Sequence, residues 1–387
     1  MQNAFLKFDP SRVPSPCFVV DEQAVENNLK ILARVRDESG AKVLLALKAF
    51  SMFSFAPLVR RYLDGCCASG YHEARLAREE FGGEVHTYSA AFHPRNFPEV
   101  LELSDHVVFN SLSQWQRHRS ESLEKQQSKP SLQFGLRINP MHSEGAEPIY
   151  DPCSPHSRLG TVLSTLEGAD LSDFSGLHFH TLCEQGFEPL ARTLDAIESV
   201  FGHRLHEFKW LNFGGGHHIT KPGYNVSGLI ERIKTIQQKY KLQVYLEPGE
   251  AIAIHSGVLI TEVLDVIHNQ GDIAILDCSA TCHMPDTLEM PYRAEILGGG
   301  KANEKRHTYR LGGLSCLAGD VMGDYSFDKP LDVGQRLMFD DMSHYTMVKT
   351  TTFNGVALPA LAIWKSKTDE LKLVKEFGYQ DFKSRLS

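Results

Sequence analysis

Short runs of apolar and β-branched residues recur along the first two thirds of the chain, and segments with helical periodicity follow most of them. Eight such runs occur, at Val43–Lys48, Gly65–Gly70, Glu84–Ser89, Asp105–Asn110, Gln133–Asn139, Gly176–Cys183, Trp210–Gly216 and Val244–Glu250. Strands buried on both faces of a parallel sheet have this continuous apolar character. Among the intervening segments, Val226–Tyr240 repeats apolar residues at helical spacing, with charges opposite them. Eight β/α units over about 210 residues predict a (β/α)8, or TIM, barrel.

A doubly wound nucleotide-binding sheet is the alternative architecture for such a pattern. It needs fewer strands and a G-x-G-x-x-G turn after the first of them. No such turn follows Val43–Lys48, so the barrel is favoured.

The pattern changes after about residue 255, where short strands alternate with turns rich in Gly, Pro and Asp. Strands are predicted at Val258–Ile267, Asp272–Asp277, His307–Leu311, Gln335–Asp340 and Tyr345–Thr350. No long helical stretch is expected before the charged tail that follows Trp364. We therefore predict a barrel over residues 22–255 and a mostly antiparallel β domain over 256–387. The strand Cys17–Asp21 would join that domain together with the rest of residues 1–21.

The chain carries a formal net charge of −8 and no long basic run. Nucleic acid is not an expected partner, because duplex binding needs clustered Lys and Arg; the acidic balance suits a cationic small molecule. No apolar run approaches the ~20 residues that span a bilayer, and MQNAFLKFDP lacks the pattern of a signal peptide. The eight cysteines are scattered, unlike those of a disulfide scaffold. We expect a cytoplasmic protein with reduced thiols and no membrane partner.

Four predicted strand ends carry chemically useful groups, and barrel enzymes place their chemistry at these ends. A lysine that follows five apolar residues, Lys48, would have a lowered pKa and could form an imine. Gly214–Gly216 would let backbone amides approach an anion, and Glu247 could hold a proton on a pyridine nitrogen. His180 lies near the end of the sixth predicted strand.

Each of these residues also has an ordinary structural explanation. Lys48 could extend its amine from a strand end into solvent, the glycines could form a tight turn, and Glu247 could join an ion pair. Histidines at 178, 180, 217 and 218 and the sequence Cys278-x3-Cys282-His283 permit a metal site. No complete four-ligand set with zinc spacing occurs, so no metal is predicted.

Taken together, the motifs resemble those of the fold-type III pyridoxal-phosphate decarboxylases, which include the diaminopimelate, ornithine and biosynthetic arginine decarboxylases. The matching segments are Leu45–Phe50, Cys67–Glu73, Leu136–Pro140, Ser157–Gly160, His178–Glu184, Leu211–His218, Glu247–Glu250, Cys316–Tyr325 and Tyr345–Gly355. Their order and spacing cover nearly the whole chain. The resemblance implies a barrel of the alanine-racemase type, a pyridoxal 5′-phosphate cofactor and a homodimer with shared active sites.

The resemblance also implies roles for individual residues. Lys48 would hold the cofactor as a Schiff base, His180 would stack on its ring, and Glu247 would pair with the pyridine nitrogen. The Gly214–Gly216 loop and Tyr345 would contact the phosphate. Cys316 would donate a proton to the product carbon in the neighbouring subunit. Substrate contacts are implied for Cys183, Glu184, Asp286, Glu289 and Asp320.

Two departures narrow the resemblance to one branch. Glu250 stands where the family often has an Arg that supports the phosphate, and the HTLCE segment replaces the commoner H-x-G-S. With Cys282–Arg293, these changes resemble the carboxynorspermidine decarboxylases, which also often accept carboxyspermidine and produce norspermidine or spermidine. Asp286 and Glu289 would suit a distal ammonium, although Arg293 follows closely and a solvated loop is the ordinary explanation.

Other functions stay open on the sequence alone. The first alternative is a decarboxylase of diaminopimelate or another basic amino acid. An amino-acid racemase on the same barrel, a non-catalytic regulator of the same fold and a metal-dependent hydrolase are further alternatives.

Overall fold

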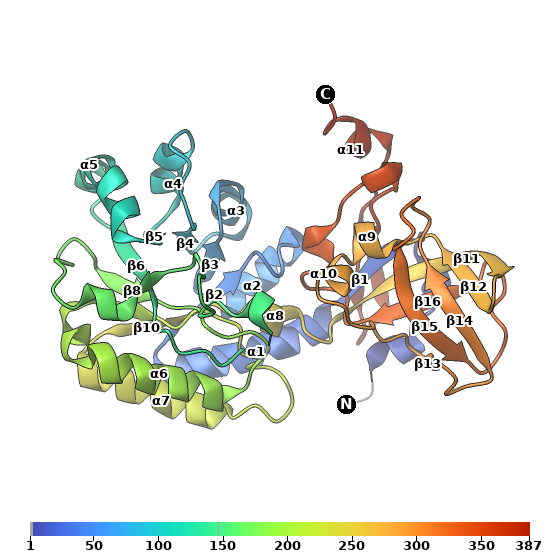
Figure 1. The fold of residues 1–387 in the computed structure, drawn as a ribbon, viewed down its shortest axis with the longest axis horizontal. Helices are drawn as coiled ribbons and strands as arrows, with labels where there is room; N and C mark the ends of the chain where they lie inside the picture. The colour runs from blue at the N-terminus through green and yellow to red at the C-terminus, as the bar shows by residue number, and fades with distance from the viewer. Residues whose placement is uncertain (1–2, 146) are drawn as a thin grey trace. The chain divides into compact units, whose positions relative to one another are not determined.

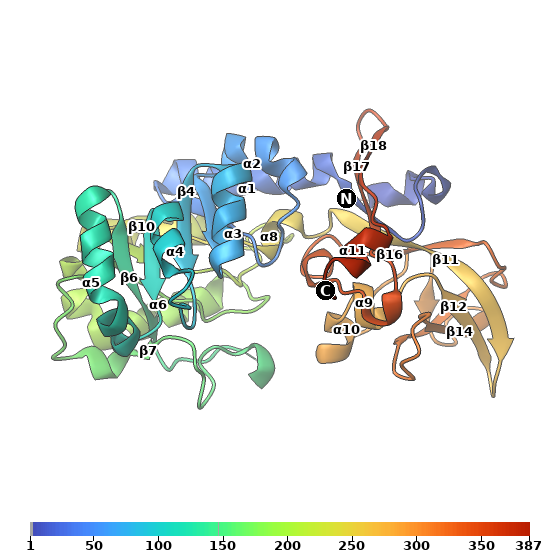
Figure 2. The same ribbon diagram turned by 90° about the horizontal axis from the view of Figure 1, so that it is seen from above.

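The structure of the chain, a computed structural model, describes residues 3–145 and 147–387. It divides into two compact units, shown in Figures 1 and 2. One unit is Asn27–Ile252, and the other joins the chain up to Glu26 with Ala253–Ser387. No helix of the described residues is long and apolar enough to cross a membrane.

The predicted (β/α)8 barrel is confirmed in the first unit, with helices on the outside of the strands (Figure 1). Its eight parallel strands close because β10 pairs with β2 and β5 pairs with β6. The strands are β2 (Lys42–Ala46), β3 (Gly65–Ala68), β4 (Glu84–Tyr88), β5 (His106–Phe109), β6 (Gln133–Asn139), β8 (Gly176–His178), β9 (Trp210–Asn212) and β10 (Gln243–Leu246). A two-residue strand, β7 (Thr161–Val162), adds to β6.

One helix, α1 (Glu22–Ser39), precedes the first barrel strand, and helices follow most of the strands, as the periodicity predicts. The latter are α2 (Ala56–Tyr62), α3 (Tyr71–Leu76), α4 (Phe97–Leu103), α5 (Leu112–Ser128), α6 (Phe187–Phe201), α7 (Val226–Tyr240) and α8 (Glu250–Ala253). Helix α3 continues into a single π turn at Ala77–Phe81. In α7 the apolar residues at helical spacing are the buried ones, so that helix packs its predicted face.

The barrel interior holds a cluster of rings around Trp210, with His106, Tyr245 and His86 at centroid distances of 4.8, 6.1 and 6.5 Å. An added β-carbon would lie 2.3 Å from the Trp210 ring at Gly135 on β6 and 2.0 Å at Gly176 on β8, so both positions need glycine. The indole N–H donates to Gln133 Oε1 at 3.0 Å. Because interiors are close-packed, the large indole ring is matched by the two glycines that face it.

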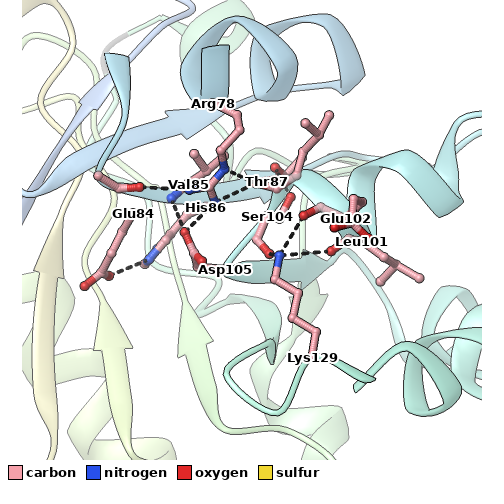
Figure 3. Close-up of polar contacts among 12 residues, drawn as sticks. Arg78, Glu84, Val85, His86, Thr87, Leu101, Glu102, Ser104, Asp105 and Lys129 are labelled. Atoms are coloured by element: carbon pink, nitrogen blue, oxygen red, sulfur yellow. Dashed lines mark hydrogen bonds and ion pairs between the residues drawn. The ribbon is translucent and has the colours of Figure 1, made fainter. Parts of the chain in front are cut away.

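Polar contacts fix the starts of β4 and β5, as Figure 3 shows. Asp105 accepts hydrogen bonds from the Arg78 guanidinium at 2.7 Å and from the Val85 amide at 2.8 Å. Lys129 donates to the carbonyls of Glu102 (2.7 Å) and Ser104 (2.6 Å), at the end of α4. Cations favour helix C-termini because unpaired carbonyls gather there. These contacts hold the two strands in register.

The second unit is built on a nine-stranded, mostly antiparallel sheet, as predicted. Strand β1 pairs with both β11 and β17 and so connects the N-terminal segment to this sheet. The strands are β1 (Cys17–Asp21), β11 (Gly257–His268), β12 (Asp272–Leu276), β13 (Gly300–Lys301), β14 (His307–Gly312), β15 (Val321–Phe327), β16 (Arg336–Asp340), β17 (Ala360–Lys365) and β18 (Glu370–Lys375). Short helices α9 (Ala280–His283), α10 (Asp286–Glu289) and α11 (Tyr379–Lys383) complete the unit.

Two predictions about this unit are wrong. The segment Tyr345–Thr350 is not a strand, because Tyr345 has a left-handed φ of 50° and Met347–Lys349 form a 3₁₀ turn. The tail after Trp364 is not mainly helical, since Glu370–Lys375 pairs with β17. In both places tertiary contacts override the local preference of the sequence.

Candidate active site

Lys48 lies at the C-terminal end of β2, in a turn that neighbouring strands hold. The Leu47 amide donates to Cys67 O at 3.1 Å, and the Ala46 amide donates to Pro248 O at 2.9 Å. Burial lowers the pKa of the Lys48 ammonium, and the charge of Arg137 lowers it further. A lysine with a lowered pKa has more of its nucleophilic neutral form, which an imine requires.

Glu247 lies at the end of β10 and receives two side-chain hydrogen bonds. Asn212 Nδ2 donates to Oε1 at 2.7 Å, and His178 Nε2 lies 3.1 Å from Oε2. Burial favours the neutral acid, but the hydrogen bonds from His178 and Asn212 favour the charged form and lower the pKa of Glu247. The carboxyl is therefore a buried anion at the mouth of the barrel.

His180 faces the glycine run that follows β9. The Gly215 amide donates to His180 Nδ1 at 3.0 Å, so the neutral ring carries its proton on Nε2. Burial lowers the pKa of His180 well below its usual value, and the charge of Lys48 adds to this effect. The ring is neutral, which suits stacking on a flat aromatic ligand.

The three glycines are required by close backbone contacts. An added β-carbon would lie 2.4 Å from Phe179 O at Gly214, 2.2 Å from Glu247 O at Gly215 and 1.8 Å from Leu182 O at Gly216. Gly214 and Gly216 also have positive φ values of 67° and 81°. The loop therefore fits tightly between the ends of β8 and β10, and no other residue type fits it.

Sequence reasoning did not single out three side chains that the barrel adds to this group. Asn212 binds Glu247, as described above. The Arg137 guanidinium donates to His180 O at 3.1 Å and lies 4.6 Å from the centre of the Tyr88 ring. Tyr88 and Asn212 are the last residues of β4 and β9, and Arg137 lies two residues before the end of β6, so all three stand at or near the strand ends where barrel enzymes place their chemistry.

Cys316 and Asp320 lie in the second unit, on the turn between β14 and β15. Cys316 is exposed, and its amide donates to Asn354 Oδ1 at 2.8 Å. Asp320 is buried and accepts from the hydroxyls of Ser279 (2.8 Å) and Ser315 (2.6 Å). Its carboxylate therefore anchors the loop that presents Cys316.

Asp286 and Glu289, on α10, share one cation. The Lys349 ammonium donates to Asp286 Oδ1 at 2.5 Å and also to Glu289. Burial opposes charge on Lys349, but the two carboxylates outweigh it and raise its pKa. The three groups together stay net negative. Tyr345 lies shortly before the 3₁₀ turn Met347–Lys349, whose last residue is this lysine.

Cys183 and Glu184 follow β8, and Glu184 has a left-handed φ of 54°. Glu184, His218 and Glu250 bring one ligand atom each within 4.8 Å of the others, and His218 Nε2 lies 3.2 Å from Glu250 Oε2.

The second unit contains the pattern Cys278-x3-Cys282-His283, which permits a metal site on sequence alone. Both ring nitrogens of His283 are already hydrogen-bonded, to the Ser279 amide and to Ala357 O.

Comparison with known proteins identifies close relatives along the whole chain. Residues 17–343 match the family described as pyridoxal-dependent decarboxylase, C-terminal sheet domain. A Campylobacter jejuni carboxynorspermidine/carboxyspermidine decarboxylase is 44% identical, over 97% of this chain and 99% of its own length. A Synechocystis carboxyaminopropylagmatine decarboxylase is 46% identical, over 97% of this chain and 96% of its own length.

Solved structures agree with these relatives. Carboxynorspermidine decarboxylase from Campylobacter jejuni, crystallised with norspermidine, superposes with a TM-score of 0.88 and 42% identity, covering 96% of this chain and all (100%) of that chain. Diaminopimelate decarboxylase from Helicobacter pylori, complexed with L-lysine, has a TM-score of 0.79 at 15% identity and covers 97% of both chains. The second likeness is one of fold.

Proposed function

The chain belongs to the pyridoxal-dependent decarboxylases, and we propose that it removes the α-carboxyl group of carboxynorspermidine, and of carboxyspermidine, in polyamine biosynthesis. The observation that carries this proposal is the 44% identity, over nearly the full length of both chains, to a Campylobacter jejuni enzyme named for these two substrates. The predicted family is confirmed by the match over residues 17–343.

The barrel residues fit pyridoxal 5′-phosphate as the cofactor. Lys48 supplies an amine with a lowered pKa to hold the aldehyde, and Glu247 supplies a buried carboxylate for a protonated ring nitrogen. His180 supplies a neutral ring for stacking. The cofactor supplies an electron sink for the bond that loses CO2, and a protonated ring nitrogen deepens that sink.

The phosphate is proposed to bind at the Gly214–Gly216 loop, with Tyr345 as a further contact. The Gly214 amide already donates to Asn212 Oδ1 at 2.8 Å and the Gly215 amide to His180, so the phosphate would rely on amides further along the loop. Glu250 cannot provide the positive charge that an Arg provides at this position in many family members. Backbone N–H groups bind phosphate without a cation.

Cys316 is proposed to protonate the product carbon, acting from a second copy of the chain in a homodimer. Its exposed side chain is available to a partner, and Asp320 holds its loop through the hydroxyls of Ser279 and Ser315. Asp320 would support the substrate contact indirectly, through the position of this loop.

The distal ammonium of the substrate is proposed to bind near Asp286 and Glu289, with Cys183 and Glu184 as further contacts. Lys349 offsets only part of the charge of the two α10 carboxylates, and the remaining negative charge attracts a cation while it disfavours the distal carboxylate of diaminopimelate. A distal guanidinium is the second candidate, because the Synechocystis relative at 46% identity is named for carboxyaminopropylagmatine.

A CO2-release assay tests the proposal directly. The purified protein, loaded with pyridoxal 5′-phosphate, is offered carboxynorspermidine, carboxyspermidine, carboxyaminopropylagmatine, diaminopimelate, ornithine and arginine. We expect the highest kcat/KM with carboxynorspermidine or carboxyspermidine. Faster release from carboxyaminopropylagmatine would select the second candidate, and faster release from diaminopimelate, ornithine or arginine would refute both.

A further inference from the structure

We infer that His178 is a positioning residue that fixes the orientation and hydrogen bonding of Glu247, so that this carboxylate meets a protonated pyridine nitrogen. The inference rests on the proposed use of pyridoxal 5′-phosphate. It concerns a residue of the barrel interior to which the sequence assigned no role in cofactor binding.

The register of three adjacent strands places His178 beside Glu247. His178 on β8 pairs with Asn212 on β9, and Asn212 pairs with Tyr245 on β10. Glu247 lies two residues beyond Tyr245, so its side chain projects on the same side of the sheet. Each carboxylate oxygen then has its own partner, Asn212 for Oε1 at 2.7 Å and His178 for Oε2 at 3.1 Å.

His178 is a neutral donor in this arrangement. It is only 2% exposed, and burial lowers the pKa of its imidazole, an effect that the charge of Glu247 opposes. Because Glu247 is an anion, Nε2 carries the proton, and Nδ1 is left as a bare acceptor. Nδ1 is buried without a hydrogen-bond partner. A buried acceptor without a partner is costly, so Nδ1 contributes nothing that favours this ring orientation. The bond from Nε2 to Glu247 is what explains it.

The ring of His178 is held in place by its neighbours. The Tyr88 ring on β4 stacks on it with centroids 5.8 Å apart and planes 22° apart, and Arg137 on β6 covers the Tyr88 ring at 4.6 Å. The charges of Arg137 and Lys48 both act on His178 and disfavour its protonation. The imidazole therefore stays neutral and fixed while it donates to Glu247.

Without this donor, Glu247 would keep only the hydrogen bond from Asn212. It would lose the second bond that orients the carboxylate and stabilises its charged form. A hydrogen bond to the ionised form favours ionisation, whereas burial alone favours the neutral acid. A protonated Glu247 could still accept a hydrogen bond, but it would carry no negative charge to stabilise a protonated ring nitrogen. Replacement of His178 should therefore weaken cofactor binding only when the cofactor has a pyridine nitrogen for Glu247 to stabilise.

A comparison of two cofactors isolates this effect. Apoprotein is titrated with pyridoxal 5′-phosphate and with its 1-deaza analogue, in which a C–H replaces the ring nitrogen, and dissociation constants are measured by fluorescence quenching. We expect His178→Phe to weaken binding of pyridoxal 5′-phosphate about tenfold while binding of the analogue changes little. His178→Gln retains an N–H donor and should recover part of the difference.

His106→Phe is the matched control, since His106 is another buried barrel histidine, stacked on Trp210 at 4.8 Å. It should leave the ratio of the two dissociation constants at its wild-type value. His178→Leu, smaller and also without a donor, answers the same question if the Phe ring is not accommodated.

Equal weakening of both cofactors in His178→Phe, or no change in either, would overturn the positioning role. Failure of the proposed function has a different result. In that case the wild-type protein forms no imine absorbance with either cofactor, and Lys48→Ala changes neither spectrum.

Discussion

The indole ring of Trp210 occupies the space that a side chain at Gly176 would need, since an added β-carbon there would lie 2.0 Å from ring atom Cδ2. Gly176→Ala should therefore destabilise the protein by about 3 kcal/mol or prevent folding, because overpacking forces the surrounding atoms apart. Urea unfolding followed by circular dichroism measures this change. Gly168→Ala, where nothing lies within 4 Å, is the control and should be nearly neutral. A stable Gly176→Ala protein would contradict this packing.

Replacement of Lys48 tests the proposed imine. Lys48→Ala should abolish the visible imine absorbance of the loaded protein and reduce kcat by roughly 10³-fold or more. The readouts are an absorbance spectrum and CO2 release. Lys349→Ala is the control for loss of a lysine, and it should retain the imine band. A spectrum unchanged in Lys48→Ala would assign the cofactor to another residue.

Cys316→Ala tests the proposed proton donor. Loss of a general acid typically costs 10²- to 10⁴-fold, so we expect kcat to fall by about 10²-fold with the imine absorbance retained. Incorporation of solvent deuterium at the product carbon should also lose stereochemical control. Cys153→Ala, at a buried cysteine of the barrel, should show neither effect. Loss of cofactor binding in Cys316→Ala would contradict the proton-donor role.

Asp286→Asn tests recognition of the distal ammonium. We expect KM for carboxynorspermidine to rise about tenfold, which corresponds to a loss of roughly 1.4 kcal/mol of binding, while kcat changes little. Steady-state kinetics provide both values. Glu295→Gln, an exposed carboxylate paired with Arg293, is the control and should leave KM unchanged. An unchanged KM in Asp286→Asn would leave Asp286 as a structural partner of Lys349.

Buried His106 predicts acid sensitivity of the barrel. Burial lowers the pKa of His106, and the charges of His86 and Lys42 lower it further, so the ring stays neutral when folded. The unfolded chain binds this proton near pH 6.5. The contribution of His106 is thus fully present above pH 6.5 and is lost as pH falls, by up to about 1.4 kcal/mol per pH unit. His106→Phe should show a shallower decrease of Tm between about pH 6.5 and 5. An identical pH dependence would refute the assignment.

Much of the architecture follows from the sequence because apolar runs and helical periodicity are local properties. The barrel strands begin within a residue or two of the predicted positions, and Gln133–Asn139 and Val226–Tyr240 have the predicted bounds. The ends of the strands are less predictable. The sequence predicts longer strands at Gly176–Cys183 and Trp210–Gly216, but these strands end at His178 and Asn212, because the chain leaves the sheet there to form loops.

The candidate site shows the same division between local and tertiary information. Lys48, His180 and Glu247 can be identified from the sequence, because each follows an apolar run and resembles a known motif. The bond between His178 and Glu247 and the covering of Tyr88 by Arg137 depend on which strands are adjacent, and residues 69 positions apart meet only after the barrel closes. Lys349, the partner of Asp286 and Glu289, is likewise distant in sequence, 63 and 60 residues away. The sequence predicts a strand around this lysine and gives no sign of the pairing. Sequence alone therefore determined the kinds of chemical group and the β/α units that carry them, and tertiary structure decided which groups are charged, because burial and hydrogen-bond partners set each pKa.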